Sequence, residues 1–306
     1  MSNSSSDLHT LRSADRIRSD LLTWYEATKR DLPWRRTRDP YAVLVSEVML
    51  QQTQAARVAV RFPRFMARFP TAHALASALP AAVLAEWTGL GYNRRALSLR
   101  RAAATVSRDG WPANVAGLER LPGVGPYTAR AVASLAFGTP VGVVDTNVRR
   151  WLVRRFGIGD TPAELQHQAD ALAAPGTEAE VSAWTHATME FGATICRSRA
   201  PRCGECPIAT DCPSRGLATA VPVPRQAPLL GSDRAYRGSL VRLLATVPEH
   251  ELTEAASRQS LGGDPERIGP ELDDAGWERI VAGLERDGLI HRSEGWVKLG
   301  AATIDP

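Results

Sequence analysis

The chain has 306 residues and a formal net charge of +4, enough for one large or two modest domains. No run of about 18 apolar residues occurs, and the polar start MSNSSSDLHT has no hydrophobic signal core, so the sequence predicts neither a membrane-spanning helix nor a secretion signal. We therefore expect a cytoplasmic protein. Its four cysteines all lie within residues 196–212, and in that compartment they predict metal or cluster ligands rather than disulfides.

Charge is unevenly distributed along the chain. Residues 1–247 contain 31 Lys and Arg against 20 Asp and Glu, a net of +11, whereas residues 248–306 contain 6 against 13, a net of −7. The larger part is therefore a candidate polyanion-binding region, and the C-terminal part is not. Scattered, solvated charge is the alternative explanation.

Apolar residues at helical spacing dominate the chain from about residue 13 to residue 212. We expect a disordered tail over 1–12 and an all-helical domain over 13–215. Its subdomains would be roughly 31–142 and 13–30 together with 143–215. Short Gly/Pro-rich segments separate the expected helices, which lie near 17–28, 42–58, 80–87, 95–107, 128–137, 146–156, 163–173 and 181–195.

A proline-rich, aperiodic segment over 216–235 is typical of a linker. After it we expect helices near 238–247, 252–259 and 272–287, and then a hairpin over 289–299 with Ser-Glu-Gly as its turn. Helices followed by a hairpin predict a small α+β module over 236–306 that resembles a winged helix.

The cysteines follow the pattern C-x6-C-x2-C-x5-C. Four thiolates can hold either a tetrahedral zinc ion or a cubane iron–sulfur cluster. Structural zinc usually uses two C-x2-C pairs, and here only one such pair exists. The spacing favours the larger cluster, and zinc stays open as the alternative.

The segment LPGVGPYTA lies between two expected helices. Gly123 and Gly125 permit a tight turn, and Pro126 suits the first position of a helix. Free N–H groups at such a helix start bind phosphate without reading base sequence. The pattern favours a helix–hairpin–helix phosphate site over an ordinary turn between helices.

Two carboxylates stand out in apolar surroundings. Glu47, in SEVMLQQT, has Leu44, Val48 and Leu50 nearby, a setting that raises a carboxyl pKa and suits a general acid. Asp145, in VVDTNVRR, precedes an expected helix. The simpler interpretations are a hydrogen-bonded buried glutamate and a helix N-cap. Taken together, a proton donor and a second carboxylate are what cleavage of a glycosidic bond needs.

These elements together resemble the helix–hairpin–helix DNA glycosylases that carry an iron–sulfur cluster, and above all the MutY-type adenine DNA glycosylases. The similar segments are LPWRRTRDPYAVLVSEVMLQQTQ, WTGLGYNRRA, LPGVGPYTA, DTNVRR and the cysteine pattern, in the family's order over roughly residues 15–215. The resemblance implies the mostly α helix–hairpin–helix glycosylase fold. It also implies a [4Fe–4S] cluster on Cys196, Cys203, Cys206 and Cys212.

The resemblance implies a monofunctional enzyme of base excision repair. Its substrate would be double-stranded DNA with adenine opposite 8-oxoguanine or guanine, and its product an abasic site. Glu47 would protonate the adenine ring, Asp145 would stabilise the cationic sugar, and Asn147 would support that site. Tyr127 takes the position where strand-cleaving relatives carry a lysine, and a phenol cannot form a Schiff base.

Further roles follow from the same resemblance. Tyr92 matches an aromatic wedge that enters the base stack, and Gln52 and Thr53 match residues near the lesion and the base opposite. Arg30 and Trp34 match the wall of the adenine pocket, and His186 takes a position where relatives more often have Gln or Glu. The expected contacts to DNA are completed by Arg94, Gly123, Val124 and Gly125. Between the first two ligands, Arg197, Arg199 and Arg202 would face phosphate.

The C-terminal part departs from the family. Many MutY-type enzymes carry a β-rich domain there, and residues 236–306 are too short and too helical for it. A winged helix that reads DNA is normally basic. We therefore expect this acidic module to pack on the catalytic domain or to bind a protein partner. Otherwise we expect a monomer, located in a bacterial cell with the nucleoid.

Two other functions stay open from the sequence. One is a mismatch thymine or uracil glycosylase of the same superfamily, against which the acid in EVMLQQT argues. The other is a non-enzymatic, redox-sensing DNA-binding protein, against which the Glu47/Asp145 pair and the acidic module argue.

Overall fold

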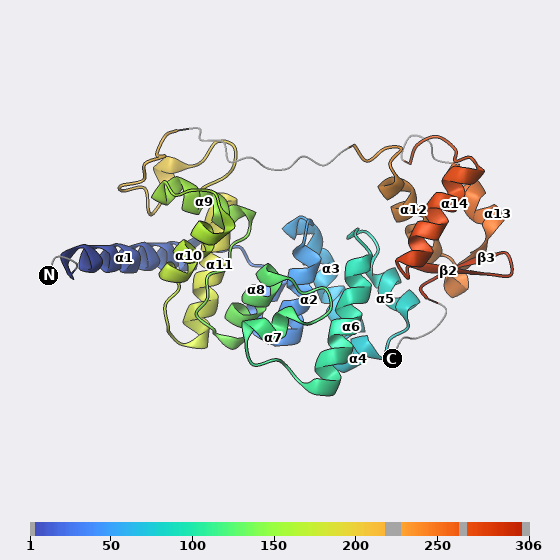
Figure 1. Cartoon of the computed structure of the whole chain (residues 1–306), viewed down its shortest axis with the longest axis horizontal. Helices are drawn as coiled ribbons and strands as arrows, with labels where there is room; N and C mark the ends of the chain where they lie inside the picture. The colour runs from blue at the N-terminus through green and yellow to red at the C-terminus, as the bar shows by residue number, and fades with distance from the viewer. Residues whose placement is uncertain (1–3, 218–227, 263–267, 302–306) are drawn as a thin grey trace. The chain divides into compact units, whose positions relative to one another are not determined.

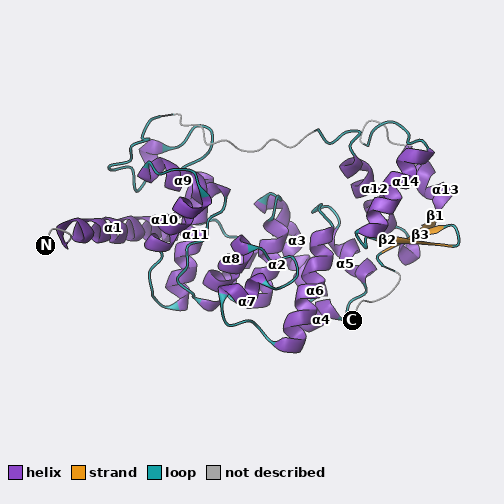
Figure 2. Cartoon of the chain, in the orientation of Figure 1, coloured by secondary structure: helices purple, strands orange, loops and turns teal. Residues whose placement is uncertain are grey.

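The computed structural model describes residues 4–217, 228–262 and 268–301, and it is mostly helical (Figures 1 and 2). Among these residues, no helix is both long enough and apolar enough to cross a membrane. The first eleven helical elements are α1 (Ser4–Thr28), η1 (Pro33–Arg36), α2 (Pro40–Leu50), α3 (Ala55–Arg68), α4 (Ala72–Ala76), α5 (Pro80–Trp87), α6 (Arg94–Asp109), α7 (Val115–Glu119), α8 (Pro126–Phe137), α9 (Thr146–Phe156) and α10 (Pro162–Leu172). The others are α11 (Glu178–Thr194), η2 (Cys203–Glu205), α12 (Asp233–Thr246), η3 (Pro248–His250), β1 (Glu251–Thr253), α13 (Glu254–Gly262), α14 (Asp274–Arg286), β2 (Ile290–Ser293) and β3 (Trp296–Leu299).

The N-terminal boundary differs from the expected one. Helix α1 begins at Ser4, within the segment 1–12 where we expected a disordered tail. Residues 4–28 contain no Pro or Gly, so no helix-breaking residue interrupts this stretch. Half of the expected linker 216–235, residues 218–227, lies outside the described ranges, and α12 begins within its end.

The chain divides into two compact units, each made of separate stretches of sequence. Unit 1 contains residues 1–47, 112–120 and 124–224, and unit 2 contains 48–111, 121–123 and 225–306. This division differs from the subdomains that we expected, because α7 and α8 group with the N-terminal helix and the C-terminal module groups with α3–α6. The expected domain boundaries stay predictions.

Unit 1 is built around α11. Helices α1, α8 and α9 all pack against it. Its core contains the fully buried side chains of Leu21, Trp151, Leu152 and Phe191. The Trp151 and Phe191 rings meet edge to face with centroids 5.8 Å apart, an arrangement that aromatic pairs favour. A backbone carbonyl approaches closely at Gly192, where a Cβ would lie 2.6 Å from the Asn147 oxygen. Glycine there lets α11 and the start of α9 meet.

Unit 2 combines α3–α6 with the C-terminal module. Phe65, Trp87 and Leu99 are buried in the helical part, and α4 packs along α6. In the module, α12, α13 and α14 accompany a three-stranded antiparallel sheet in the order β1-β3-β2. The expected hairpin over 289–299 is confirmed by β2 and β3. Strand β1 takes the start of the segment where we expected only a helix, because Leu252 pairs opposite Val297.

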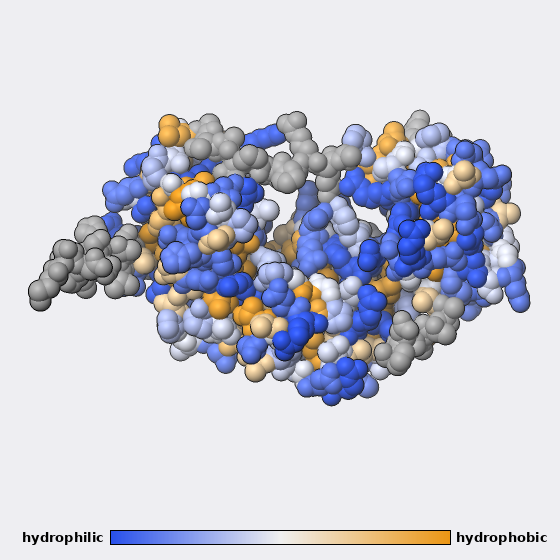
Figure 3. All heavy atoms as spheres, in the orientation of Figure 1, coloured by the Kyte–Doolittle hydropathy of each residue, from blue (hydrophilic) through white to orange (hydrophobic). Residues whose placement is uncertain are grey.

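The module packs within unit 2 against α5. Both α12 and β3 contact that helix, and a Cβ at Gly300 would lie 3.1 Å from the Ala81 nitrogen. At the end of α14, Asp287 forms ion pairs with Arg94, at 3.5 Å, and with Arg237. The face of the module seen in Figure 3 is mainly hydrophilic. The expectation that the module packs on other parts of the chain agrees with these contacts.

Candidate active site

Glu47 is a buried carboxylic acid in the apolar helix α2. Only 4% of its surface is exposed, and its Oε2 atom is buried without a hydrogen-bond partner among the described residues. Burial raises its pKa to about 7, the nearby charge of Asp145 raises it too, and a hydrogen bond from Tyr127 works in the opposite direction. Near neutral pH the group therefore exists in both its protonated and its ionised forms.

Tyr127 lies in the first turn of α8 and directs its hydroxyl to Glu47. Burial first, and then the charges of Glu47 and Asp145, raise the pKa of the phenol well above 10. The hydroxyl therefore stays protonated and acts as a hydrogen-bond donor. The backbone that places it is set by Pro126 at the start of the helix.

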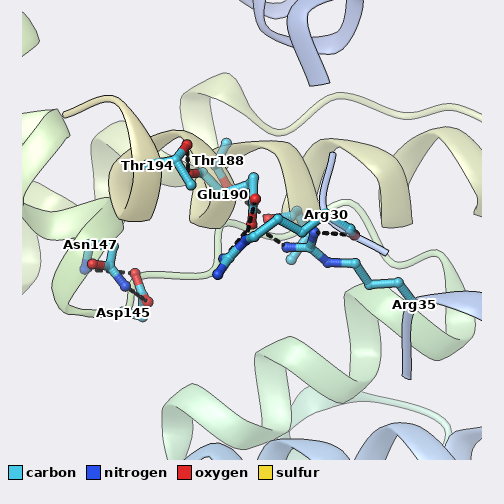
Figure 4. Close-up of polar contacts among 8 residues, drawn as sticks. Arg30, Arg35, Asp145, Asn147, Thr188, Glu190 and Thr194 are labelled. Carbon is cyan, nitrogen blue, oxygen red and sulfur yellow. Dashed lines mark hydrogen bonds and ion pairs between the residues drawn. The ribbon is translucent and has the colours of Figure 1, made fainter. Parts of the chain in front are cut away.

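Asp145 is the N-cap of α9, and it is held in a different way from Glu47. Its Oδ1 accepts hydrogen bonds from the backbone N–H groups of Asn147 and Val148, at 2.8 and 2.6 Å, and its Oδ2 accepts one from the Asn147 side chain at 2.8 Å (Figure 4). Burial raises the pKa of this carboxyl overall, although these donors and the charge of Arg150 lower it. The donors stabilise the ionised form of Asp145, whereas Oε2 of Glu47 has no such partner among the described residues.

A chain of hydrogen bonds connects Asp145 to the first cysteine. Arg150 donates from Nη2 to the Asn147 side-chain oxygen at 3.0 Å and to the Gly192 carbonyl at 2.5 Å. Its Nε donates to the carbonyl of Cys196 at 2.7 Å. Arg150 is only 6% exposed. The orientation of Asn147, and through it that of Asp145, therefore depends on where the backbone at Cys196 lies.

A second buried carboxylate, Glu190 on α11, binds two arginines (Figure 4). Arg30 donates to both of its oxygens, at 2.6 and 2.7 Å, and Arg35 donates to Oε2 at 2.7 Å. Burial alone would raise the pKa of Glu190, but the hydrogen bonds and charges of the two arginines lower it overall. A carboxylate that is 1% exposed thus stays ionised because two guanidinium groups neutralise it.

The three expected residues of the adenine pocket all lie near this cluster. Arg30 belongs to it, and Trp34 is buried in η1, one residue before Arg35. His186 lies on α11 one turn before Glu190. Burial first, and then the charge of Arg35, lower the pKa of His186 to about 3, so its imidazole is neutral at physiological pH. The structure brings these residues together on unit 1.

The hairpin before α8 has the expected geometry. Gly123 has a φ of 75°, and a Cβ there would lie 2.6 Å from the Cβ of Ser98, so glycine is required both for conformation and for space. Val124 is buried, at 6% exposure. Gly125 is the N-cap of α8, with open space around it and no side-chain cap. The first N–H groups of α8 are thus not capped by a side chain of the hairpin.

The expected lesion-binding residues lie on two loops of unit 2. Gln52 and Thr53 follow α2, and Tyr92 and Arg94 come directly before and at the start of α6. Thr53 donates to the Leu90 carbonyl at 3.3 Å, which joins the loops. Tyr92 is 44% exposed and Arg94 has a 72% exposed side chain, although Arg94 also pairs with Asp287.

All four cysteines line one cavity, together with the apolar side chains of Trp151, Phe191 and Ile208. The thiols are free rather than joined in disulfides. Four thiols around one cavity can hold either a single zinc ion or a cluster in which each thiolate binds a different iron atom.

Comparisons with known proteins agree with this site. Residues 45–175 match the family described as HhH-GPD superfamily base excision DNA repair protein. The chain is 44% identical to the adenine DNA glycosylase of Mycolicibacterium smegmatis over 234 residues, covering 74% of this chain and 79% of the relative. It is 42% identical to the human adenine DNA glycosylase over 217 residues, covering 65% of this chain and 39% of that one.

The chain belongs to the adenine DNA glycosylase family. The fold also matches solved structures of the superfamily. A thermostable thymine-DNA glycosylase aligns with a TM-score of 0.62 and 30% identity, over 68% of this chain and 98% of that one. An endonuclease III–DNA complex aligns with a TM-score of 0.55 and 25% identity, over 65% and 93%. The predicted helix–hairpin–helix glycosylase fold and the predicted MutY-type family are confirmed.

Several residues of the site were not anticipated from the sequence. Glu190 lies in the apolar run MEFGATIC, and the signal that identified Glu47, an acid among apolar neighbours, would have found it. Arg35, Arg150 and Arg95, which lies in the first turn of α6, are three of the chain's many arginines. Which carbonyls and carboxylates they bind depends on segments far away in the sequence, so no local pattern marks them.

The burial of Glu47 predicts a pH-dependent gain in stability for Glu47→Gln. The folded protein binds the Glu47 proton more tightly than the unfolded chain, so folding loses stability as the pH rises from 4.5, and the loss levels off above about 7. The full loss in the free energy of unfolding is about 3 kcal/mol. The neutral amide avoids this loss. We expect Glu47→Gln to melt several degrees above the wild type at pH 8 and close to it at pH 5.

The control is Glu119→Gln, which removes an exposed carboxylate from the end of α7 in the same unit. Melting curves by circular dichroism at both pH values make the comparison. A Glu47→Gln variant whose melting temperature differs from that of the wild type by the same amount at pH 5 and pH 8 would show that burial does not raise the pKa of Glu47.

Proposed function

We propose that the protein is a monofunctional adenine DNA glycosylase that removes adenine opposite 8-oxoguanine, and also adenine opposite guanine, from double-stranded DNA. The observation that carries this proposal is Glu47, a buried acid whose pKa is about 7, beside the hydrogen-bonded carboxylate of Asp145 and the phenol of Tyr127. The family of the chain and the DNA-bound structure of endonuclease III support DNA as the partner.

In the first step, Glu47 donates its proton to a ring nitrogen of the adenine. The glycosidic bond then breaks, and its electron pair leaves with the base, which departs as neutral adenine. General acid catalysis is most effective when the pKa of the donor lies near the working pH, and burial brings Glu47 to that value. Its unpartnered Oε2 has no competing acceptor among the described residues.

In the second step, the positively charged sugar is stabilised by Asp145. The donors from Asn147 and Val148 hold this carboxylate in a fixed orientation, so little reorganisation is needed when the charge develops. Water adds to the C1′ carbon and gives up a proton, which restores the acid form of Glu47. The product is an abasic site with the strand intact.

Strand cleavage would need an amine that attacks C1′ and forms a Schiff base. At the position facing Glu47 the chain has Tyr127, whose hydroxyl is a hydrogen-bond donor and cannot form an imine. This residue is the reason for proposing hydrolysis alone.

Binding of the flipped adenine is assigned to unit 1. Arg30 belongs to the Glu190 cluster, and Trp34 and His186 lie near it. The neutral imidazole of His186 can both donate and accept a hydrogen bond. Contact with the duplex is assigned to the N–H groups at the start of α8, after Gly123, Val124 and Gly125, and to Arg94, Gln52 and Thr53. Tyr92 would enter the stack beside the lesion.

The four cysteines are proposed as ligands of a [4Fe–4S] cluster. Their shared cavity, lined also by apolar side chains, and the C-x6-C-x2-C-x5-C spacing support it over a single zinc ion. When bound, the cluster would hold the loop over 196–212 rigid, and hydrolysis needs no redox chemistry. Arg197, Arg199 and Arg202, which lie between the first two ligands, are assigned to phosphate contact.

The structural likeness to a thymine-DNA glycosylase gives the competing function. Excision of thymine or uracil does not require ring protonation of the kind that a buried acid with a pKa near 7 supplies. The higher identity to adenine DNA glycosylases, 44% against 30%, also favours adenine.

A base-release assay tests the function. We expect the wild type to release adenine opposite 8-oxoguanine and opposite guanine, and no pyrimidine from T opposite G or U opposite G. Glu47→Gln should keep binding the duplex and lose roughly 10²–10⁴-fold in single-turnover rate, because proton donation is lost. The wild-type rate should fall as the pH rises above about 7, where Glu47 loses its proton. Release of thymine would instead establish the competing function, and normal excision by Glu47→Gln would refute the mechanism.

Tyr127→Lys tests the assignment of Tyr127. A lysine at this position can attack C1′ as the base leaves, so we expect the variant to nick part of the product strand without alkali treatment. Borohydride should trap a covalent complex between the enzyme and DNA. Tyr127→Phe serves as the control because it has no nucleophile. If neither nicking nor trapping occurs although adenine is still released, Tyr127 does not face the reacting sugar.

Chemical analysis tests the cluster. Protein purified without oxygen should be brown and contain about four iron atoms and four sulfides per chain. Cys203→Ser should lower both contents and lower the melting temperature. One zinc ion per chain in a colourless, folded protein would contradict the cluster and leave the glycosylase function standing.

A further inference from the structure

Two loops of unit 2 contain residues in a strained backbone conformation. Gln52, in the loop after α2, has a φ of 53°, and Tyr92, in the loop between α5 and α6, has a φ of 47°. Residues other than glycine rarely adopt this left-handed region, and they stay there only when surrounding contacts hold them. The two strained residues are those that the resemblance places at the lesion.

One side chain, Arg95 in the first turn of α6, binds both loops. Its Nη1 donates to the carbonyls of Val48 and Gln51, at 2.7 and 2.5 Å. Its Nη2 donates to the carbonyls of Leu90 and Gly91, at 3.1 and 2.9 Å. Three longer bonds complete the set: to the Met49 carbonyl at 3.2 Å, to the Thr53 hydroxyl at 3.3 Å and, from Nε, to the Tyr92 carbonyl at 3.4 Å.

The position of these bonds in the chain is specific. Gln51 comes directly before Gln52, and Gly91 comes directly before Tyr92, so each terminal nitrogen of Arg95 fixes the carbonyl that leads into a strained residue. The two carbonyls belong to separate loops, and the planar guanidinium sets the distance between them. A lysine ammonium could not reproduce this two-pronged arrangement, called the Arg95 fork below, because all its donors sit on one nitrogen.

The surroundings of Arg95 keep the fork in place. Trp87 donates from its indole nitrogen to the same Gly91 carbonyl at 3.1 Å. The Trp87 and Tyr92 rings also lie 5.4 and 5.6 Å from the guanidinium carbon. Burial lowers the pKa of Arg95 to about 10, so the side chain still carries its charge at neutral pH. The charge is balanced by carbonyl dipoles rather than by a carboxylate.

We propose that Arg95 is a positioning residue for lesion recognition, which holds the loops over 50–54 and 88–93 in one fixed relation and thereby sets the preference for 8-oxoguanine over guanine opposite adenine. This inference rests on the proposed function, because the lesion preference has a meaning only for an adenine glycosylase. A merely structural arginine would, when replaced, slow excision from both mispairs to the same extent. A positioning residue changes their ratio.

The test compares Arg95→Lys with Arg101→Lys in the full chain. Arg101 is an exposed arginine on the same helix that bonds to Ser98 at 3.4 Å, so its replacement makes the same chemical change away from the loops. Single-turnover rates on A opposite 8-oxoguanine and A opposite guanine are measured for both variants, together with hydrogen–deuterium exchange of the free proteins. Exchange reports on the loops whether or not the protein excises adenine.

For Arg95→Lys we expect faster exchange in both loops and a fall of about tenfold or more in the ratio of the two rates, because small displacements of positioning groups have large kinetic effects. Arg101→Lys should match the wild type in both measurements. Unchanged exchange overturns the inference, and so do loosened loops with an unchanged rate ratio. A wild type that excises no adenine from either duplex refutes the proposed function, and the exchange data then still decide whether Arg95 joins the loops.

A second variant guards against a folding failure of Arg95→Lys. Trp87→Phe keeps a ring in the core and removes one donor to Gly91, which belongs to the second loop alone. Exchange should rise in residues 88–93 and stay unchanged in 50–54, with a smaller fall in the rate ratio. An equal rise in both loops would show that the core around Trp87, and not the fork of Arg95, determines their order, and would overturn the inference.

Discussion

The burial of one carboxyl in an apolar helix is the constraint on which the site depends. Glu47 can donate a proton near neutral pH only because α2 removes it from water, and the same burial destabilises the folded chain when that proton is lost. Burial raises the pKa of Asp145 as well, but three hydrogen-bond donors at a helix start work against that rise and favour its ionised form. The two carboxyls of the site thus differ in hydrogen bonding, because Oε2 of Glu47 has no such donor among the described residues.

Arginine side chains that bond to several acceptors at once fix the geometry around Asp145 and Glu190. Arg150 joins Asn147 to the backbone of Cys196, and Arg30 and Arg35 neutralise Glu190. Each guanidinium connects segments that are distant in the sequence, and each is held by two or more acceptors. Lysine could not replace them, because its ammonium lacks the planar set of donors. The chain has lysine only at Lys29 and Lys298, so nearly all of its basic side chains are arginines that can bond in this way.

Much of the fold and the family could be predicted from the sequence, because the informative residues are contiguous in short motifs. The hairpin at Gly123 and Gly125 and the burial of Glu47 are both signalled by residues adjacent in the sequence, and the structure has the turn and the buried carboxyl that these patterns predict. The start of α1 at Ser4 and strand β1 were missed. Strand β1 exists because Leu252 pairs with Val297, a contact across more than forty residues that no local spacing reveals. The role of Arg95 escaped notice for the same reason, since its bonds to the Val48 and Gln51 carbonyls also cross more than forty residues.

The net negative charge of the C-terminal module does not mean that its carboxylates are unpaired. Its negative balance suggests an open acidic surface, yet many of its carboxylates are engaged within the module. Arg292 binds both Glu278 and Glu285, and Lys298 binds Glu251. Arg292 and Lys298 are therefore engaged by carboxylates of the module rather than available for phosphate. Its contacts with α5, and the Asp287 pair with Arg94 at the start of α6, instead make it a structural support for the unit that carries the two loops joined by Arg95.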